Sequence, residues 1–356
     1  MIPSEVLAIM KTKPEPGIEL RPFRVPAPQA GEVIVRVGAA GLCGSDLHIY
    51  KWSSGYEWME KLMPLVLGHE FAGEVVAAGE NAASLLGKRV VVRHILPCGK
   101  CKTCVSGRSY LCQVCRPKAL GLRRNGGFAV YAAVPADHCI PMPDDMSYEL
   151  GALVQPMVLA ANSAARAGVT LGDRVVVFGP GPIGLLTLAA ARAAGATELV
   201  MIGTAGDEER LAIAAKIGAT AILNAAERNP VQAVRELFGE DGADVVFEAT
   251  GAPETVVQGM HMLRPGGTFG VIGIHQKPLV LDLKMFVRAD LTMIGMHEGP
   301  VSWERALALV HANADTLKHV ITHRYPLEEA EAAFEAALHK RGAKIMFIPS
   351  GEEDAG

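Results

Sequence analysis

The chain has 356 residues, of which 50% are hydrophobic and 20% charged, and its formal net charge is −4 at pH 7. This length accommodates two domains with separate cores, and the composition is that of a folded soluble enzyme. The weak negative charge excludes the basic surface expected of a protein that binds nucleic acid or an anionic membrane. The expected partner is therefore a small-molecule substrate, with no nucleic acid and no membrane.

The N-terminal residues and the cysteine content indicate the cellular compartment of the protein. The first residues contain no basic segment followed by an apolar core, and no apolar run is long enough to cross a membrane. We therefore expect a cytoplasmic protein, in which the seven cysteines stay reduced and available for metal. Cys115 and Cys139 are expected to be small packing residues.

The predicted elements change character near Leu150. Before it, short β-type runs such as 32–37 and 88–92 are separated by turn residues, which is typical of an all-β, barrel-like domain. After it, strands alternate with Ala-rich helical stretches, which is typical of a parallel α/β sheet. The predicted strands are 174–178, 199–202, 221–224, 244–249, 268–273 and 292–296, and the predicted helices are 182–194, 207–217, 230–238 and 253–263. Six such strands fit a doubly wound, dinucleotide-binding domain.

The last part of the chain is expected to return to the first domain. Amphipathic stretches at 302–312 and 327–339 precede a last predicted strand, 344–348, and a polar end from Ser350. The predicted domains are therefore 1–154 and 155–297, with 298–356 completing the first.

Two short segments of the first domain suggest an open metal site. One runs from Cys43 to His48, and the other is Gly68-His69-Glu70. A catalytic zinc needs about three protein ligands and one exchangeable position, and Cys43 and His69 are suitable ligand types. Taken singly, Cys43 could be a buried small residue and His69 a hydrogen-bonded core histidine.

A second metal site is indicated by four cysteines within fifteen residues. These are Cys98, Cys101, Cys104 and Cys112. Four thiolates at this spacing can close a tetrahedral cage around one zinc ion with no position left open, so the site would be structural. The alternative is a set of unrelated or disulfide-paired cysteines, which the reducing compartment disfavours. The predicted zinc lobe is 93–116.

A glycine-rich turn predicts the cofactor site. The buried-strand run 175–178 leads directly into Gly179-Pro180-Gly181-Pro182-Ile183-Gly184 and then into a predicted helix. In this context Gly179 permits a tight turn, Gly181 lets the backbone approach a pyrophosphate, and Gly184 allows close helix–strand packing. The helix N-terminus supplies N–H donors for the pyrophosphate.

The choice between NAD and NADP is open from the sequence. The acidic residue that would bind the ribose of NAD is missing at the end of the second strand, where Gly203 and Thr204 stand. These small residues leave room for a 2′-phosphate, with Thr204 as donor and Arg210 as counter-charge. Asp207 and Glu208 would repel that phosphate, so the preference for NADP is slight.

These motifs together resemble a known family. Gly68-His69-Glu70 with Gly73, Gly79 and Ala82 matches a zinc signature, and Cys43-Gly44-Ser45-Asp46 with His48 matches a first catalytic segment. The cysteine quartet and the glycine-rich turn follow in the matching order. The chain thus resembles the zinc-containing medium-chain dehydrogenases/reductases of the alcohol dehydrogenase superfamily. Residues 43–52 are most similar to the threonine and sorbitol (polyol) dehydrogenase branch.

The resemblance implies a fold and a set of roles. The fold would be α/β, with a GroES-like β-barrel catalytic domain and a Rossmann domain, and each chain would hold one catalytic and one structural zinc. Cys43 and His69 would bind the catalytic zinc, and Asp46 would orient a ligand histidine. Ser45 would hydrogen-bond the substrate hydroxyl and pass its proton toward His48. Glu70 would be a ligand or a nearby carboxylate that moves as ligands exchange.

One departure from the family pattern concerns the third ligand. The polyol branch carries Glu-Pro near the domain junction, whereas this chain has Gln155-Pro156. Either Gln155 coordinates weakly through its carbonyl oxygen, or Glu70 takes the position and Gln155 faces the substrate.

The expected activity is zinc-dependent hydride transfer between a secondary alcohol, of the polyol or amino-alcohol type, and NAD or NADP. Two alternatives are a zinc-independent quinone or enone reductase of the same fold and a non-catalytic, nucleotide-binding redox sensor. The substrate pocket is expected near Ser45, Tyr50, Trp52, residues 53–62, Arg93, Leu122, His297 and Glu298. The apolar stretch Leu279–Leu283 and the strand 292–296 predict a homodimer or homotetramer.

Overall fold

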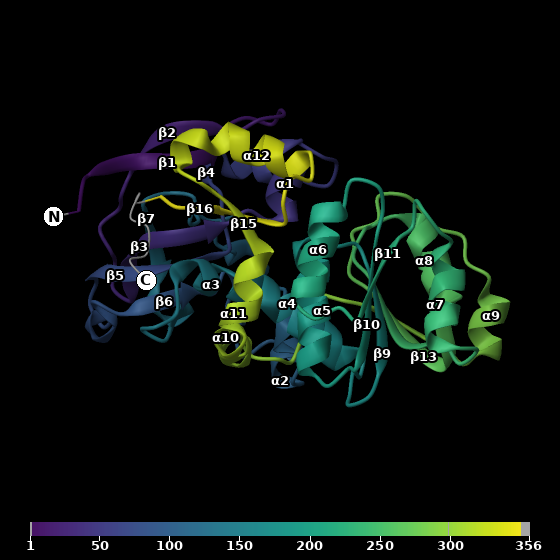
Figure 1. Ribbon diagram of the computed structural model, residues 1–356. Coiled ribbons are helices and arrows are strands. Elements are labelled where there is room, and N and C mark those ends of the chain that lie inside the picture. The colour runs from purple at the N-terminus through teal and green to yellow at the C-terminus, as the bar shows by residue number, and fades with distance from the viewer. Residues whose placement is uncertain (1, 298, 350–356) are drawn as a thin grey trace. The chain divides into compact units, whose positions relative to one another are not determined.

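The computed structural model describes residues 2–297 and 299–349 (Figure 1). Glu298 and the polar end from Ser350, both named above, lie outside the described residues. The chain divides into two compact units. The first runs to Gln155 and resumes at Trp303–Ala314 and from Ile321, and the second comprises Pro156–Ser302 and Asp315–Val320. The predicted return of 298–356 is thus interrupted by a short piece that clusters with the second unit.

The first unit is built on two sheets. The larger has the strand order β15-β16-β3-β5-β6-β8, with β7 also paired to β3, and the smaller has the order β2-β1-β4. All their pairings are antiparallel except that of β15 with β16. The strands are β1 Glu5–Lys11, β2 Glu19–Arg24, β3 Glu32–Gly41, β4 Leu65–Val66, β5 Phe71–Ala78, β6 Arg89–Val92, β7 Tyr131–Pro135, β8 Cys139–Pro141, β15 Ile321–Tyr325 and β16 Lys344–Phe347.

Short helices of the first unit lie in its connections. They are α1 Gly44–Tyr50, α2 Lys102–Val105, α3 Tyr148–Ala152, α10 Trp303–Ala312 and α12 Ala330–Leu338. The predicted stretch 327–339 is a 3₁₀ turn, Leu327–Glu329, followed by α12. Phe334 of α12 and Phe347 of β16 belong to the same buried cluster as Val33 and Val35 of β3. The C-terminal strand and helix therefore complete the core of the first unit.

The second unit contains one six-stranded parallel sheet with the order β11-β10-β9-β12-β13-β14. This order reverses between β9 and β12, as in doubly wound dinucleotide folds. Its strands are β9 Arg174–Phe178, β10 Glu198–Gly203, β11 Ala221–Asn224, β12 Ala243–Glu248, β13 Leu263–Val271 and β14 Thr292–Gly295. The run Val175–Phe178 is buried throughout, because helices cover both faces of such a sheet.

The helices of the second unit are α4 Val154–Arg166, whose first two residues precede the unit boundary, α5 Pro182–Ala193, α6 Glu208–Lys216, α7 Pro230–Phe238, α8 Pro253–Met260, α9 Leu283–Arg288 and α11 Ala314–Leu317, whose first residue belongs to the first unit. Figure 1 shows α5 and α6 on one side of the sheet and α7 and α8 on the other. Asn229 accepts hydrogen bonds from the amides of Val231 and Gln232, and Gly239 follows the last residue with φ 74°, which fixes both ends of α7.

One predicted helix was too long. The helix expected over 253–263 ends at Met260, and β13 already begins at Leu263. Leu263 pairs with Ala243 before a register shift in the ladder, so pairing with β12 overrides the apolar helical pattern there. The other predicted elements of the sheet agree with the observed ones to within one or two residues, except that β13 starts five residues earlier.

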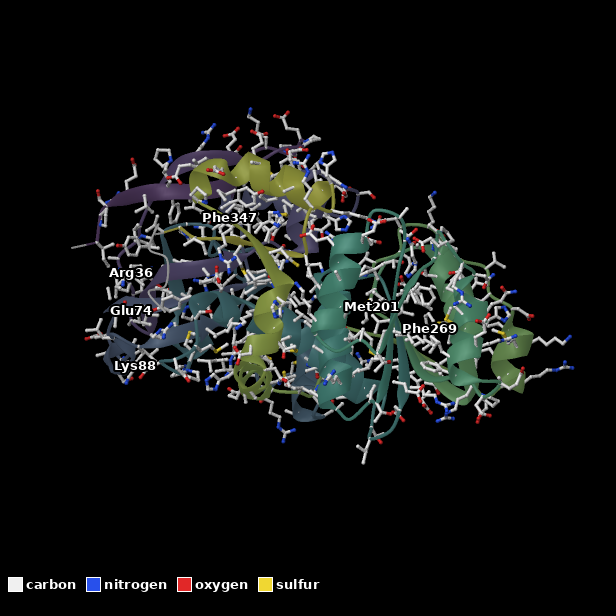
Figure 2. All side chains as sticks on the ribbon, in the orientation of Figure 1. Arg36, Glu74, Lys88, Met201, Phe269 and Phe347 are labelled. Carbon is white, nitrogen blue, oxygen red and sulfur yellow. The ribbon has the colours of Figure 1, made fainter. Side chains whose placement is uncertain are left out.

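Each unit has its own apolar interior. Figure 2 labels Phe347 in the first unit and Met201 and Phe269 in the second. All three side chains are buried. Among the described residues, no helix is both long and apolar enough to span a bilayer.

Candidate functional site

The first candidate ligand stands at the start of a helix. Cys43 follows β3 directly and occupies the N-cap of α1, with extended backbone. Its amide donates a hydrogen bond to Asp46 Oδ2 at 3.0 Å, and Asp46 is completely buried. This capping interaction fixes the backbone from which the Cys43 sulfur projects.

His69 and Glu70 come from the turn between β4 and β5. Gly68 has φ 89°, a backbone conformation that side chains disfavour, and a Cβ there would overlap the Phe128 ring. The turn leaves both His69 and Glu70 buried. A glycine before this pair is therefore required by conformation and by space.

The structure brings Cys43, His69 and Glu70 together. One ligand atom from each lies within 4.8 Å of the other two. Ser45 Oγ is 3.5 Å from His69 Nε2, and Asp46 Oδ1 is 3.7 Å from His69 Nδ1. The cluster thus combines a sulfur, an imidazole nitrogen and a carboxylate oxygen, which is a ligand set that zinc accepts.

A lysine from the far end of the chain joins this cluster. Lys344 Nζ pairs with Glu70 Oε2 and also donates to the Leu42 carbonyl at 2.9 Å, and its side chain is buried. Glu70 Oε1 is buried and has no hydrogen-bond partner in the described part of the chain. One carboxylate oxygen is thus neutralised by Lys344, and the other remains for a ligand such as a metal ion.

The electrostatics of the cluster favour a cation. Burial raises the pKa of Asp46 to about 6, against the opposing influence of His69. Burial lowers the pKa of His69, but the negative charges of Cys43 and Asp46 outweigh it and raise that pKa to about 9. The acidic groups therefore stabilise positive charge at the imidazole, the position where a metal ion would replace the proton.

The other predicted residues of this region lie around the cluster. His48 Nδ1 is 3.4 Å from Ser53 Oγ, and within the described residues no direct hydrogen bond joins His48 to Ser45. Gln155 is the second residue of α4 and half-buried. His94, which the sequence analysis did not select, lies with its ring centroid 5.7 Å from that of His69.

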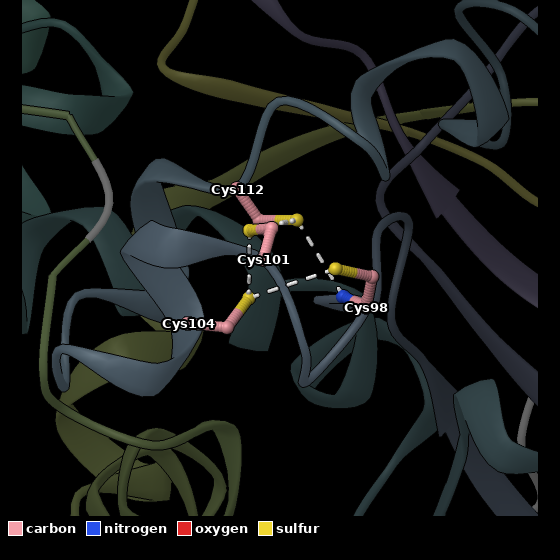
Figure 3. Close-up of side chains that lie close together, drawn as sticks. All are labelled: Cys98, Cys101, Cys104 and Cys112. Atoms are coloured by element: carbon pink, nitrogen blue, oxygen red, sulfur yellow. Dashed lines mark hydrogen bonds between the residues drawn. The ribbon is translucent and has the colours of Figure 1, made fainter.

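The cysteine quartet forms the second cluster (Figure 3). The sulfur–sulfur distances are 3.4 Å for Cys101–Cys104, 3.7 Å for Cys101–Cys112 and 3.9 Å for Cys98–Cys104. Four sulfurs at about 2.3 Å from a tetrahedral zinc would lie about 3.8 Å apart, so the cage fits the ion. The Cys98 amide donates to Cys112 Sγ and lowers the pKa of that thiol to about 5. None of the seven cysteines is in a disulfide.

The glycine-rich turn lies at the carboxyl end of β9. Gly179 has φ 93°, and Gly181 is the N-cap of α5, which begins with Pro182 and Ile183. A Cβ on Gly184 would overlap the Gly179 carbonyl oxygen, whereas one on Gly181 would meet nothing within 4 Å. The helix thus packs tightly on the turn while the backbone at Gly181 stays open to a ligand.

The loop after β10 differs from the sequence expectation in one respect. Asp207 is buried, and its Oδ2 accepts a hydrogen bond from the Thr204 amide at 3.1 Å. Thr204 is exposed, and Arg210 is half-buried, which lowers the pKa of its guanidinium. The Asp207 carboxylate is therefore engaged with the backbone of its own loop rather than displayed on the surface.

Comparisons with known proteins identify the family of the chain. Residues 29–144 match the alcohol dehydrogenase GroES-like domain, and residues 182–312 match the zinc-binding dehydrogenase family. The L-threonine 3-dehydrogenase of Bacillus licheniformis is 34% identical over 348 residues, covering 96% of this chain and 98% of its own length.

Two solved structures share the fold. A protein described as a zinc-binding dehydrogenase, from Sinorhizobium meliloti and bound to NADP, has a TM-score of 0.89 at 29% identity and covers 98% of this chain and 100% of its own. The galactitol-1-phosphate dehydrogenase of Escherichia coli has a TM-score of 0.85 at 28% identity and covers 96% of this chain and 100% of its own. The expected fold class, a GroES-like domain with a Rossmann domain, is confirmed. The chain therefore belongs to the zinc-containing medium-chain dehydrogenases/reductases, in the threonine and polyol dehydrogenase branch, and is an oxidoreductase that interconverts alcohols and ketones with a nicotinamide cofactor.

Proposed function

We propose that Cys43, His69 and Glu70 hold a catalytic zinc ion at which a small secondary alcohol is oxidised. The observation that carries this proposal is that Glu70, which lies in a cluster with a thiol and an imidazole, has a buried Oε1 without a protein partner among the described residues. An unsatisfied buried carboxylate oxygen is costly, and a metal ion would satisfy it. Zinc bound there supplies a Lewis acid that makes a substrate hydroxyl more acidic.

The residues around the cluster then have separate tasks. Ser45, 3.5 Å from His69 Nε2, is placed to accept the hydroxyl proton of a substrate beside the ligands. Asp46 faces the other nitrogen of His69 and orients its ring. Burial, aided by Lys51, lowers the pKa of His48, so His48 is neutral and able to accept a proton near pH 7. Because His48 contacts Ser53 rather than Ser45, the proton needs an intermediate carrier between Ser45 and His48.

Glu70 is the proposed third ligand, in preference to Gln155. Its carboxylate belongs to the cluster, and Lys344 holds one oxygen so that the other is directed toward a ligand. A neutral amide binds zinc more weakly than a carboxylate. Gln155 is then left to contact the substrate.

A second zinc in the quartet Cys98, Cys101, Cys104 and Cys112 is part of the proposal. The sulfur spacing supports it, and the closed set leaves no position for a substrate. Each chain would therefore bind two zinc ions, one of them structural.

For the cofactor we propose NADP. The loop from Gly203 presents the exposed Thr204, and the Asp207 carboxylate is turned to the Thr204 amide instead of the surface. A 2′-phosphate there would have Arg210 as its counter-charge, against the negative charges of Asp207 and Glu208. The Sinorhizobium meliloti neighbour is bound to NADP.

The proposed substrates are secondary alcohols with an adjacent amino or hydroxyl group. L-threonine and galactitol 1-phosphate, which name two of the relatives, both have such groups. A panel of amino alcohols, polyols and simple secondary alcohols, assayed with NAD and NADP alongside zinc analysis, tests the proposal. Two zinc ions per chain and alcohol-dependent reduction of NADP are expected. Enone reduction without zinc, or nucleotide binding without turnover, would contradict it.

We also propose a cytoplasmic homodimer or homotetramer that pairs through β14. This strand is the last in its sheet, and Val280, Leu283 and Val287 nearby are exposed apolar side chains. An unpaired strand edge beside apolar surface favours association with a second copy. Light scattering of the purified chain would measure the assembly directly.

A further inference from the structure

An arginine of the first unit lies on a tryptophan and pairs with no acidic residue in the described part of the chain. The Arg123 guanidinium carbon is 3.8 Å from the centroid of the Trp58 ring. No carboxylate of the described residues pairs with Arg123, whereas its neighbour Arg124 pairs with Glu32 Oε1 at 3.3 Å. Arg123 is also half-buried rather than fully extended into solvent. The fold therefore holds one guanidinium in a fixed place with its charge uncompensated.

Trp58 connects this arginine to the metal cluster through the loop 53–62. The Trp58 ring centroid is 6.2 Å from that of Tyr56, and Tyr56 stacks on His48 at 6.0 Å. Burial, with the negative charges of Cys43 and Asp46, raises the pKa of Tyr56 to about 12. The rings of Trp58 and Tyr56 therefore lead to His48, which belongs to the helix that Cys43 caps.

The chain segment just before Arg123 also packs against residues near the Cys43–His69–Glu70 cluster. Two residues before it, Gly121 packs on the backbone of the turn that carries His69, where an added Cβ would lie 2.8 Å from the His69 amide nitrogen. The Leu120 amide donates to the His94 carbonyl at 2.8 Å. Both segments that form the Arg123–Trp58 pair therefore border the proposed zinc site.

Stacking leaves the hydrogen-bonding capacity of this guanidinium intact. Its N–H groups point outward in its own plane, while the aromatic ring covers one face, so two parallel donors stay available for a planar or tetrahedral anion. Burial, together with the positive charge of Arg116, lowers the pKa of Arg123, although the group stays charged at neutral pH. The two arginines produce a local positive potential, and an anion would relieve it.

From this geometry we infer that Arg123, held on Trp58, binds the anionic group of the alcohol substrate, a carboxylate or a phosphate. The inference rests on the proposed function, because the anion is placed on the molecule whose hydroxyl reacts at the Cys43–His69–Glu70 cluster. It narrows the substrate class from secondary alcohols in general to those that carry a negative charge. Arg123 would thus act in specificity and not in the chemical step.

The test is steady-state kinetics of the zinc-loaded full chain with matched pairs of substrates. L-threonine is compared with 1-amino-2-propanol, which lacks only the carboxylate, and galactitol 1-phosphate is compared with galactitol. Wild-type protein should prefer one compound that bears the anionic group over its partner that lacks it, and the preferred pair tells carboxylate from phosphate. Arg123→Gln should lower kcat/KM for that compound about 10- to 100-fold, mostly through KM, and change kcat/KM for the partner without the anionic group less than about threefold.

Two further variants separate recognition from folding. Arg124→Gln removes a neighbouring arginine that is already paired with Glu32, and it should leave the preference unchanged. Arg123→Lys keeps the charge but loses the planar fork, so it should restore only part of the preference. An equal loss for substrates with and without the anionic group in Arg123→Gln, or a wild-type protein without preference, would overturn the inference.

Calorimetry makes failure of the inference distinguishable from failure of the proposed function. Titration of the four compounds into zinc-loaded protein reports binding without turnover. Arg123-dependent binding of an anion without alcohol oxidation would reject the proposed activity and keep the anion site. Oxidation only of the alcohols that lack an anionic group, with no effect of Arg123→Gln, would reject the anion site and keep the proposed activity.

Discussion

The two candidate metal clusters of this chain are assembled in opposite ways. The quartet draws its four sulfurs from fifteen consecutive residues, with α2 and a 3₁₀ turn between them. The Cys43–His69–Glu70 cluster draws on two segments, and Lys344 comes from 274 positions beyond Glu70. The quartet is therefore a local structure closed on itself. The second cluster is held by the tertiary fold, and Glu70 Oε1 has no hydrogen-bond partner among residues 2–297 and 299–349. The contrast predicts that losing a sulfur of the quartet costs stability and spares activity, whereas losing a proposed metal ligand of the second cluster costs activity.

The largest effect is expected from Cys43→Ala, which removes a sulfur from the proposed catalytic site. Turnover should fall by roughly 10³-fold or more, because the Lewis acid accounts for several kcal/mol of transition-state stabilisation. Binding of NADPH, followed by fluorescence, should persist since the glycine-rich turn belongs to the other unit. Cys139→Ala, a thiol outside both clusters, is the control. Near-normal turnover in Cys43→Ala would refute the site.

Lys344→Met should destabilise the metal-free protein most. It leaves the buried Glu70 carboxylate without its cation, and breaking such a pair costs about 3–5 kcal/mol. The Tm of the metal-free chain should drop by roughly 10 °C, and zinc should recover part of the loss by supplying positive charge. Lys13→Met, at an exposed lysine, should change the Tm by less than about 2 °C. Equal Tm values for wild type and Lys344→Met without metal would argue against the pair.

Cys101→Ser should weaken zinc binding by the quartet and leave the catalytic activity largely unchanged. One zinc per chain should be lost, and the Tm should decrease by roughly 5 °C. This decrease is smaller than the zinc-binding free energy of isolated zinc peptides would suggest, because the surrounding domain remains folded. The kcat/KM of the molecules that remain folded should stay within about threefold of wild type. Ser106→Ala, in the same lobe, serves as the control. A variant that loses activity in proportion to zinc at constant Tm would reverse the roles of the two clusters.

The smallest effect is expected on the pH dependence of kcat/KM, through the protonation of His48 near the Cys43–His69–Glu70 cluster. Burial and the positive charge of Lys51 lower the pKa of His48, so its neutral form persists below the usual value. If His48 accepts the substrate proton, kcat/KM should decline only below about pH 6.5. Lys51→Met removes one of the two causes and should move this acid limb upward by a few tenths of a pH unit. Lys61→Met, an exposed lysine of the adjacent loop, should not move it.

The sequence predicted best the geometry of those sites whose residues all lie in one short stretch of the chain. The spacing of the four cysteines and the turn from Gly179 to Gly184 are complete in single stretches of chain, so their geometry could be predicted. The proposed choice of Glu70 over Gln155 could not, because it rests on the pairing of Glu70 with Lys344, and no local pattern connects residues so far apart. Asp207 illustrates a second limit. Its charge suggested repulsion of a phosphate, but its burial and its bond to the Thr204 amide are set by the folded loop.

The position of Lys344 on β16 has a consequence for biosynthesis. This strand pairs with β3, so the lysine reaches Glu70 only after more than 270 further residues have been translated. Until then the nascent chain carries the acidic cluster without its internal cation, and the ribosome-bound intermediate would depend on water or free metal ions to solvate it. The Cys43–His69–Glu70 cluster therefore acquires its internal cation only after β16 has been made, long after its other residues.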